Sequence, residues 1–548
     1  MSMPPTESFD YVIVGAGSAG CVLANRLSES GRHSVLLLEY GGSDHSIYIR
    51  MPTALSIPMN MPKYNWGYQT QPEPHLDGRR ISTPRGKVLG GSSSINGLVY
   101  VRGNAQDFER WEVEGASGWA YRHVLPYFKR AEKFAGGGDR YRGGDGLLHT
   151  RAGTSRNPLY ATWLEAARQA GYPLTPDING FQQEGFGKLH MTVGDGRRCS
   201  AAVAYLHPAL RRSNLTVRTH ALTTQVLFEG RRATGVEYRR GNSPHRVRAR
   251  CEVILSAGPI NSPQLLKLSG IGPATELAAH GIPVVHALPG VGENLQDHLE
   301  FYFQVASKEP ITLYSQMTPW RKTLIGLRWL LRHDGLGASN HFETGGFIRS
   351  GAGVRYPDIQ YHFLPMAVSY DGSSLAQEHG FQAHVGPMRS KSRGWVRLAS
   401  ADPLTPPTIQ FNYMSQADDW TEMRACVRLT REIFAQAAFD RYRGREINPG
   451  AAVESDEEID TFIRAHVESA YHPSCSCRMG AGTDPLAVVD PHTRVIGVDA
   501  LRVVDSSIMP SITTGNLNAP TIMLAEKAAD DILGKPPLPA PEVPYYSA

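Results

Sequence analysis

The 548-residue sequence lacks any long hydrophobic run. No stretch approaches the ~18 uninterrupted apolar residues of a membrane-spanning helix. The first ten residues, MSMPPTESFD, also lack the basic and apolar regions of a secretory signal. We therefore expect a chain without a membrane span or secretory leader, which meets a membrane only from its surface.

Cysteine and net charge are also scarce. The six cysteines include one C-x-C pair, Cys475 and Cys477, whose spacing matches neither a zinc site nor a C-x-x-C redox motif. We therefore predict no metal site, and a reducing, cytoplasmic setting. The 56 basic and 52 acidic side chains give a net charge of +4 and are interspersed, which argues against a nucleic-acid partner.

Glycine, in contrast, is abundant, at 55 residues. Gly15, Gly17 and Gly20 follow a short β-branched run and open a helical pattern, so the backbone can approach a pyrophosphate at a helix N-terminus. Glu39 ends the next predicted strand, where a carboxylate accepts hydrogen bonds from ribose hydroxyls and disfavours a 2′-phosphate. The pattern predicts a dinucleotide site but leaves FAD and NAD open.

Two polar residues near the C-terminal end are candidate catalysts. His472 lies in ESAYHPSCSCRMG, and Asn516 lies in a GNLN loop just before a predicted helix. An imidazole can take a hydroxyl proton near neutral pH, and an amide can hold the same oxygen. The sequence contains 20 histidines, so the assignment of His472 depends on this local context.

Three further motifs resemble those of the glucose-methanol-choline (GMC) flavoprotein oxidoreductases. They are GKVLGGSSSIN at 86–96, the Gly258-Pro259 stretch with Ser269-Gly270-Ile271-Gly272, and PGVGENLQDHL at 289–299. The resemblance covers essentially the whole chain. Stretches such as SNHFETGGFIRS at 339–350 look most like those of the bacterial choline dehydrogenases.

The resemblance implies an α/β fold: a Rossmann-like FAD-binding domain with an embedded α+β substrate-binding domain, in which helices flank an antiparallel sheet. We predict that residues 1–157, 201–309 and 456–548 form the FAD-binding domain, the last part carrying the catalytic residues. Residues 158–200 are a substrate-domain excursion, and residues 310–455 form the substrate-binding domain. The Pro-rich end of the chain, PPLPAPEVP, is expected to be loosely held.

The resemblance also assigns the cofactor and its contacts. Family members that tether the flavin through histidine carry it where Ile95 stands here, so FAD is expected to bind noncovalently. The implied FAD-binding residues are Gly15, Gly17, Ser18, Gly20, Glu39, Leu89, Gly91, Ser92, Asn96, Gly97, Leu98, Val99, Val226, Ala257, Asp505, Asn516, Pro520 and Thr521.

The implied reaction is oxidation of choline to betaine aldehyde, and onward to glycine betaine as in related enzymes. His472 takes the alcohol proton, Asn516 holds the developing alkoxide, and hydride passes to flavin N5. Alternatives are a GMC dehydrogenase for other primary aliphatic or aromatic alcohols, and an oxygen-using oxidase. A nicotinamide-linked dehydrogenase would not need the 86–96 loop, and a noncatalytic flavin scaffold would not need both catalytic positions filled.

Substrate and acceptor contacts are also predicted. A quaternary ammonium needs an aromatic face or a carboxylate, for which Tyr471 and Glu343 are candidates, although Tyr471 could equally pack on the flavin. Residues 320–332 place apolar side chains at helical spacing beside arginines. Such a helix is either an ordinary surface helix or one that contacts the inner face of the cell membrane. At the membrane, the enzyme would reach a quinone or another electron acceptor of the respiratory chain. The oligomeric state is left open.

Overall fold

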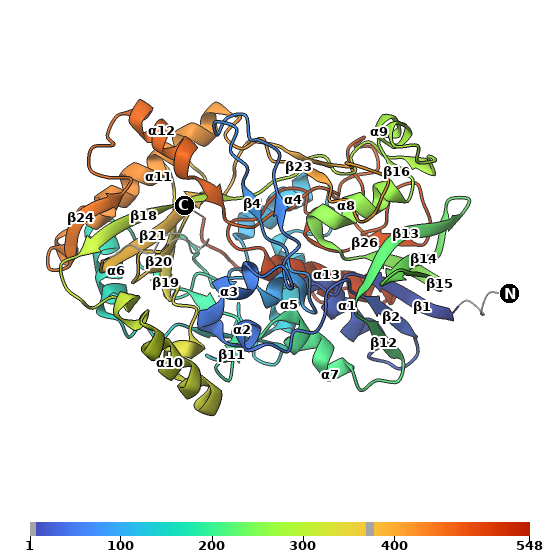
Figure 1. Ribbon diagram of the computed structural model, residues 1–548, viewed down its shortest axis with the longest axis horizontal. Coiled ribbons are helices and arrows are strands. Elements are labelled where there is room, and N and C mark those ends of the chain that lie inside the picture. The colour runs from blue at the N-terminus through green and yellow to red at the C-terminus, as the bar shows by residue number, and fades with distance from the viewer. Residues whose placement is uncertain (1–6, 369–377, 548) are drawn as a thin grey trace.

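The computed structural model describes residues 7–368 and 378–547 and contains two large sheets. The first sheet has the order β12-β2-β1-β15-β14-β13, and β26 also pairs with β15 (Figure 1). Its parallel strands are β1 (Glu7–Val14), β2 (Val35–Leu38), β12 (Leu215–Arg218), the end of β15 (Ser243–Leu255) and β26 (Leu501–Val503). Their apolar runs are buried, as expected where both faces of a parallel sheet are covered.

Helices from both ends of the chain pack together beside this sheet. Helix α1 (Ser18–Ser28) lies against α13 (Asn518–Ile532), and α13 also contacts α5 (Tyr121–Ala131). The Arg26 guanidinium donates two hydrogen bonds, of 3.0 and 2.9 Å, to the Glu526 carboxylate across the α1–α13 contact. The strands β13 (Ala221–Glu229) and β14 (Arg232–Arg240) extend the sheet as antiparallel neighbours.

The second large sheet is antiparallel, with the order β24-β18-β21-β20-β19-β8, and β25 pairs with β18. Its strands are β24 (Arg443–Asn448), β18 (Leu299–Ser307), β21 (Gly380–Pro387), β20 (Ile359–Leu364), β19 (Thr344–Ile348), β8 (Gly185–Lys188) and β25 (Glu468–Ser469). Helix α6 (Pro158–Gln169) packs on β19 and β8, and α11 (Ala417–Ala435) packs on β21 and on α12 (Asp456–His466). Trp163 of α6 is fully buried among the aromatic side chains of this sheet.

The predicted α/β fold with an embedded antiparallel sheet is confirmed. The chain nevertheless enters the second sheet earlier than the predicted boundary at residue 309, because all of β18 belongs to that sheet. Likewise β25, predicted within the last FAD-binding segment, pairs with β18. These two strands bring residues on either side of the predicted boundaries into the cavity described below.

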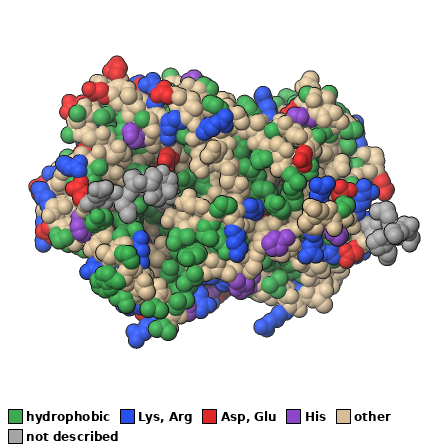
Figure 2. All heavy atoms as spheres, viewed as in Figure 1, with side chains coloured by type: hydrophobic (Ala, Val, Ile, Leu, Met, Phe, Trp, Pro, Cys, Tyr) green, Lys and Arg blue, Asp and Glu red, His purple; other side chains and the backbone are tan. Residues whose placement is uncertain are grey.

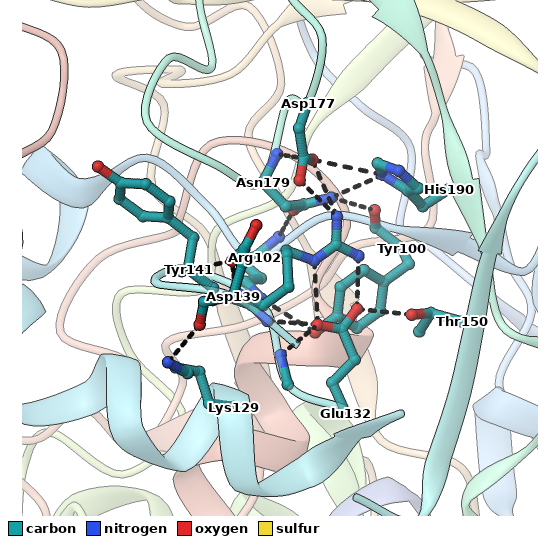
Figure 3. A network of polar contacts seen from close by, with 12 residues as sticks. Tyr100, Arg102, Lys129, Glu132, Asp139, Tyr141, Thr150, Asp177, Asn179 and His190 are labelled. Carbon is teal, nitrogen blue, oxygen red and sulfur yellow. Dashed lines mark hydrogen bonds and ion pairs between the residues drawn. The ribbon is translucent and has the colours of Figure 1, made fainter. Parts of the chain in front are cut away.

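A buried network of ion pairs fixes the segment that follows β5 (Val99–Tyr100) (Figure 3). Glu132 lies between two guanidinium groups, with carboxylate oxygens 2.5 Å from Arg102 Nη2 and 2.5 Å from Arg142 Nη2. Arg142 also contacts the Asp177 carboxylate at 2.8 Å. Burial raises the pKa of Glu132, but Arg102 and Arg142 outweigh it and hold that pKa at about 2.

The Pro-rich end of the chain is not loosely held, contrary to expectation. The Leu538 N–H donates to the Tyr127 hydroxyl at 3.1 Å, and the Tyr546 N–H donates to the Phe181 carbonyl at 2.9 Å. Leu538, Val543 and Tyr545 pack against the core of the first sheet. Over the part of the chain that the structure describes, no helix is long and apolar enough to cross a bilayer.

Candidate active site

A deep cavity of about 460 Å³ runs between the two sheets. It is lined by Gly15, Gly17 and Glu39, which follow strands β1 and β2 of the first sheet, and by His472 and Asn516. Residues that line it also come from the second sheet, namely Glu300, His362 and His384. One cavity therefore joins the predicted dinucleotide site to the predicted catalytic pair.

The dinucleotide end shows why glycine is required there. A Cβ on Gly91 would lie 2.6 Å from Gly17 Cα, and a Cβ on Gly15, where φ is +98°, would lie 2.5 Å from the Ser256 carbonyl oxygen. Gly17 caps α1 without a side-chain hydrogen bond, so the first N–H groups of that helix face the cavity. Such an N-terminus binds phosphate groups.

Glu39 occupies the end of β2, as predicted. Its carboxylate accepts hydrogen bonds from the N–H groups of Ala16 (2.9 Å) and Gly41 (2.7 Å). Burial nevertheless raises the pKa of Glu39 to about 7. Two buried hydroxyls that line the cavity, Ser256 Oγ and Thr223 Oγ1, have no hydrogen-bond partner among the described residues. These free polar atoms and the glycine cradle fit a bound dinucleotide.

Most of the predicted FAD contacts line this cavity. They are Gly15, Gly17, Ser18, Glu39, Gly91, Ser92, Asn96, Gly97, Leu98, Val99, Ala257, Asp505, Asn516 and Thr521. Gly20, Leu89, Val226 and Pro520 do not line it. Gly20 instead permits close packing, because its Cβ would lie 1.9 Å from the Gly15 carbonyl oxygen. On β13 the residues Ala221, Leu222 and Thr223 line the cavity, whereas the Val226 N–H donates to Ser269 Oγ at 2.9 Å.

The candidate base His472 is presented by an unusual turn after β25. Tyr471 has a φ of +65°, and the His472 N–H donates to the Asp297 carboxylate at 2.7 Å. Asp297 also accepts a 2.7 Å hydrogen bond from the Tyr413 hydroxyl. The left-handed residue and this buried carboxylate fix the direction in which the imidazole points.

A second histidine determines which nitrogen of His472 carries the proton. His298 Nε2 lies 3.0 Å from the Met388 carbonyl oxygen, so it must be the protonated nitrogen of His298. His298 Nδ1 is then an acceptor, and it lies 3.1 Å from His472 Nδ1. His472 therefore carries its proton on Nδ1, which leaves Nε2 as a free base.

Asn516 completes the pair. Its amide nitrogen lies 3.0 Å from His472 Nε2, and its amide oxygen accepts from Gln360 Nε2 at 3.1 Å. Burial, together with His298, His362 and Arg85, lowers the pKa of His472 well below its usual value. The imidazole is consequently neutral at neutral pH and able to accept a proton, beside an amide N–H that can hold an alcohol oxygen.

The two predicted substrate residues are placed differently. Tyr471 lines the cavity next to His472. The carboxylate of Glu343 does not line it: Oε1 accepts from Ser339 Oγ at 2.5 Å, and Oε2 accepts from the Ser155 N–H. The preceding residue, Phe342, faces the cavity instead. Both residues lie just before β19, so no strand pattern in the sequence shows which of the two side chains faces the cavity.

Sequence reasoning missed the cavity residues of the second sheet. Glu300 of β18, His362 of β20 and His384 of β21 come from separate strands, and no motif in the sequence joins them. One signal was present, since Gln360-x-His362 and Gln382-x-His384 repeat one pattern on neighbouring strands. His362 and His384 are register partners in the β20–β21 ladder.

One group of side chains has the geometry of a metal site. Ligand atoms of Asp44, His45 and His207 lie within 4.8 Å of one another. Asp44 is already engaged, because its carboxylate oxygens lie 3.1 Å from Arg50 Nη2 and 3.0 Å from His207 Nε2. The two imidazole planes are also nearly parallel, at 2°. The contacts made here are those of an ion-pair cluster.

Comparison with known proteins agrees with this geometry. Family models for GMC oxidoreductases match residues 9–300 and 390–525. A relative from Brucella suis, named oxygen-dependent choline dehydrogenase, is 60% identical over 529 residues, which cover 96% of each chain.

Solved structures show the same fold. Pyridoxine 4-oxidase from Mesorbium loti superposes with a TM-score of 0.87 at 31% identity, covering 96% of this chain and 99% of the other. An FAD-containing formate oxidase from Aspergillus oryzae superposes with a TM-score of 0.90 at 26% identity, covering 97% and 99%. The protein is therefore a member of the GMC oxidoreductase family and an FAD-dependent enzyme that oxidises alcohols.

Proposed function

We propose that this enzyme oxidises choline to betaine aldehyde, and then betaine aldehyde to glycine betaine. The observation that carries the proposal is the pairing of His472 Nε2 with the Asn516 amide at 3.0 Å, in a cavity that also contains the Glu300 carboxylate. The name of the Brucella suis relative supports choline as the substrate. Steady-state comparison of choline with hexanol and benzyl alcohol tests it, and a preference for an uncharged alcohol would contradict it.

The chain's own residues account for the proton transfer. His472 Nε2 accepts the hydroxyl proton while the Asn516 amide N–H holds the oxygen as it becomes negative. Bound FAD supplies the hydride acceptor. A positioned general base contributes typically about 10²–10⁴-fold in rate. His298 keeps Nε2 of His472 free for this step.

The cationic end of choline requires a carboxylate or an aromatic face. We assign this role to Glu300 and Phe342, with Tyr471 alongside, because all three line the cavity whereas Glu343 does not. Glu300 follows His298 by two residues at the start of β18, where β18 pairs with β25 just ahead of His472 in the chain. The carboxylate is therefore near the base but separate from it.

We propose that FAD is held noncovalently, because the side chain at position 95 is a buried isoleucine without a nucleophilic atom. The residues available to hold FAD are the glycine cradle at 15–17 and 91, Glu39, and the cavity-lining loop at 96–99. Acid precipitation should release the yellow chromophore into the supernatant. Flavin that remains in the protein pellet would refute this assignment.

We also propose a peripheral contact of helix α10 (Pro319–Arg332) with the inner face of the cell membrane. Trp320, Leu324, Leu327 and Leu331 are 59%, 54%, 50% and 81% exposed, and Figure 2 shows hydrophobic side chains gathered over α10, α2 (Ile47–Arg50) and α3 (Ser56–Met59). The segment after α10, η5 (Gly335–Ala338), packs on η1 (Pro52–Ala54), which precedes α3.

The apolar surface borders the cavity, because Met59 of α3 lines the cavity while Ile57 of the same helix is exposed. An acceptor dissolved in lipid, such as a quinone, would therefore reach the site from the membrane. Flotation with anionic vesicles tests this contact. The double variant Leu327→Asp, Leu331→Asp should lose binding and keep its turnover with a soluble dye, and a wild-type protein that does not bind would refute the contact.

Oxygen is the second candidate acceptor, since the Brucella suis relative is named oxygen-dependent. Hydrogen peroxide formation in stoichiometric amounts with choline would identify the oxidase. Reduction of a short-chain quinone in air, without peroxide, would identify the quinone-linked dehydrogenase.

A further inference from the structure

A chain of hydrogen bonds leads from the second sheet to the Glu300 carboxylate. Glu300 is 7% exposed, and its Oε1 lies 3.1 Å from Nδ1 of His384 on the neighbouring strand β21. His384 Nε2 lies 2.6 Å from Nε2 of Gln382, two residues earlier on the same strand. Both Glu300 and His384 line the cavity.

The orientation of the Gln382 amide is fixed by the backbone. The Val368 N–H lies 2.8 Å from Gln382 Oε1, and because a backbone N–H only donates, that atom must be the oxygen. Gln304 Nε2 lies 2.8 Å from the same oxygen. The amide nitrogen of Gln382 therefore faces His384 and donates to it.

This donor determines the protonation of His384. Because Gln382 donates to Nε2, that nitrogen has no proton, and the neutral imidazole carries its proton on Nδ1. His384 then donates to Glu300. If His384 were protonated on both nitrogens, its Nε2–H would face the N–H of the Gln382 amide, and two donors cannot form a hydrogen bond with each other. In the neutral form, His384 Nδ1 holds one oxygen of Glu300 at 3.1 Å and fixes the orientation of the carboxylate within the cavity that both residues line.

We propose that Gln382 and His384 are positioning residues that orient the Glu300 carboxylate in the cavity, and so make the cavity selective for a cationic alcohol. This inference rests on the proposed function. Phe342 adds an aromatic face at the same place, since its ring lies 5.3 Å from that of His384 and 5.8 Å from that of His362. A carboxylate beside an aromatic ring is a favourable site for a quaternary ammonium group.

The second Gln-x-His pair provides a matched control. Gln360 and His362, on β20, contact the Asn516 amide oxygen at 3.1 and 3.4 Å. One pair therefore supports the catalytic amide and the other supports the carboxylate. Gln360→Met should lower turnover of every alcohol, whereas Gln382→Met should affect cationic alcohols alone.

The test compares choline with its uncharged isostere, 3,3-dimethyl-1-butanol, in the purified holoenzyme. In His384→Leu and Gln382→Met, we expect kcat/KM for choline to fall about 10- to 100-fold, mainly through KM. The value for the isostere should stay within about 3-fold. His384→Asn keeps an N–H near the position of Nδ1 and should recover most of the choline activity.

In this comparison, an equal loss with both alcohols, or no recovery in His384→Asn, would overturn the inference. Flavin absorbance and melting temperature show whether each variant is folded. Binding of tetramethylammonium, followed by perturbation of the flavin spectrum, separates this inference from the proposed function. Weaker binding of tetramethylammonium to Gln382→Met than to the wild type supports the positioning role of Gln382 and His384 even if choline is not oxidised. Equal binding in both proteins refutes it.

Discussion

Replacing His298 tests whether the tautomer of His472 determines the rate. His298→Leu removes the acceptor that now lies 3.1 Å from His472 Nδ1. Without it, the His472 proton can move to Nε2, the nitrogen that must stay free. Loss of the group that fixes a catalytic histidine tautomer costs about 10⁴-fold in Ser-His-Asp enzymes.

We expect a loss here of about 10²–10⁴-fold in the rate of flavin reduction, since general-base catalysis as a whole contributes that much. This range corresponds to about 3–5 kcal/mol in activation free energy. Burial lowers the pKa of His298 to about 3, so its charge does not change between pH 6 and 9. The expected loss should therefore be independent of pH over that range.

The assay is anaerobic stopped-flow reduction of the bound flavin by saturating choline, with FAD content measured from absorbance. His298→Asn is the matched control, because its amide oxygen can replace Nδ1 as the acceptor from His472. It should retain activity within about 10-fold of the wild type, whereas His298→Leu should not. A leucine variant that reduces flavin within about 3-fold of the wild-type rate would refute the tautomer argument, as would equal losses in both variants.

Three further predictions concern the base, the ion-pair network and acid stability. His472→Ala should lower flavin reduction by at least 10² with FAD still bound, and a near-wild-type rate of anaerobic dye reduction would contradict its role as base. Glu132→Gln removes the buried carboxylate that Arg102 and Arg142 share, which leaves Arg142 with the Asp177 carboxylate alone, and should cost about 3–5 kcal/mol of unfolding free energy, measured by urea denaturation. The pKa of Glu132 is lowered to about 2 in the folded protein, so its ionised carboxylate stabilises the fold fully above the unfolded pKa of 4.5 and progressively less as the pH falls toward 2. Below pH 4.5, the melting temperature of Glu132→Gln should therefore depend less on pH than that of the wild type. Burial lowers the pKa of His341 to about 4, so this residue takes up a proton at higher pH in the unfolded chain than in the folded protein. Between pH 6.5 and pH 4 the free energy of unfolding of the wild type should therefore drop by roughly 3 kcal/mol through this residue. A His341→Gln variant whose unfolding free energy has the same pH dependence as that of the wild type would disprove this origin.

The parts of the site that were predictable from sequence are those in which function is carried by consecutive residues. Gly15, Gly17 and Glu39 follow from a strand–turn–helix pattern, and all three line the cavity. His472 and Asn516 lie 44 residues apart in the sequence, but each stands in a recognisable motif. The spacing of residues along the sequence is sufficient to predict a site when a single loop supplies all of its contacts.

The residues that sequence reasoning missed are brought together by strand pairing. Glu300, His362 and His384 share a wall of the cavity only because β18, β20 and β21 are neighbours in one sheet. Glu343 was chosen instead of Phe342 because the sequence does not reveal which of two adjacent side chains faces inward. Both residues lie in the irregular segment just before β19, where no periodic pattern in the sequence shows which side chain turns toward the cavity.

Strand β18 links the chemistry to substrate selection. His298 directly precedes β18, and its carbonyl oxygen accepts from the Ala470 N–H at 2.9 Å, which continues the ladder to β25 and brings His472 alongside. Glu300 is two residues further on, within β18. The group that orients the base and the group proposed to bind the cation are therefore two residues apart at the start of β18, and the backbone rather than flexible side chains sets their separation. A substitution that shifted β18 against β21 would disturb base orientation and cation binding together, whereas substitutions of Gln360 or His362 on β20 would reach the site through the Asn516 amide oxygen that both contact.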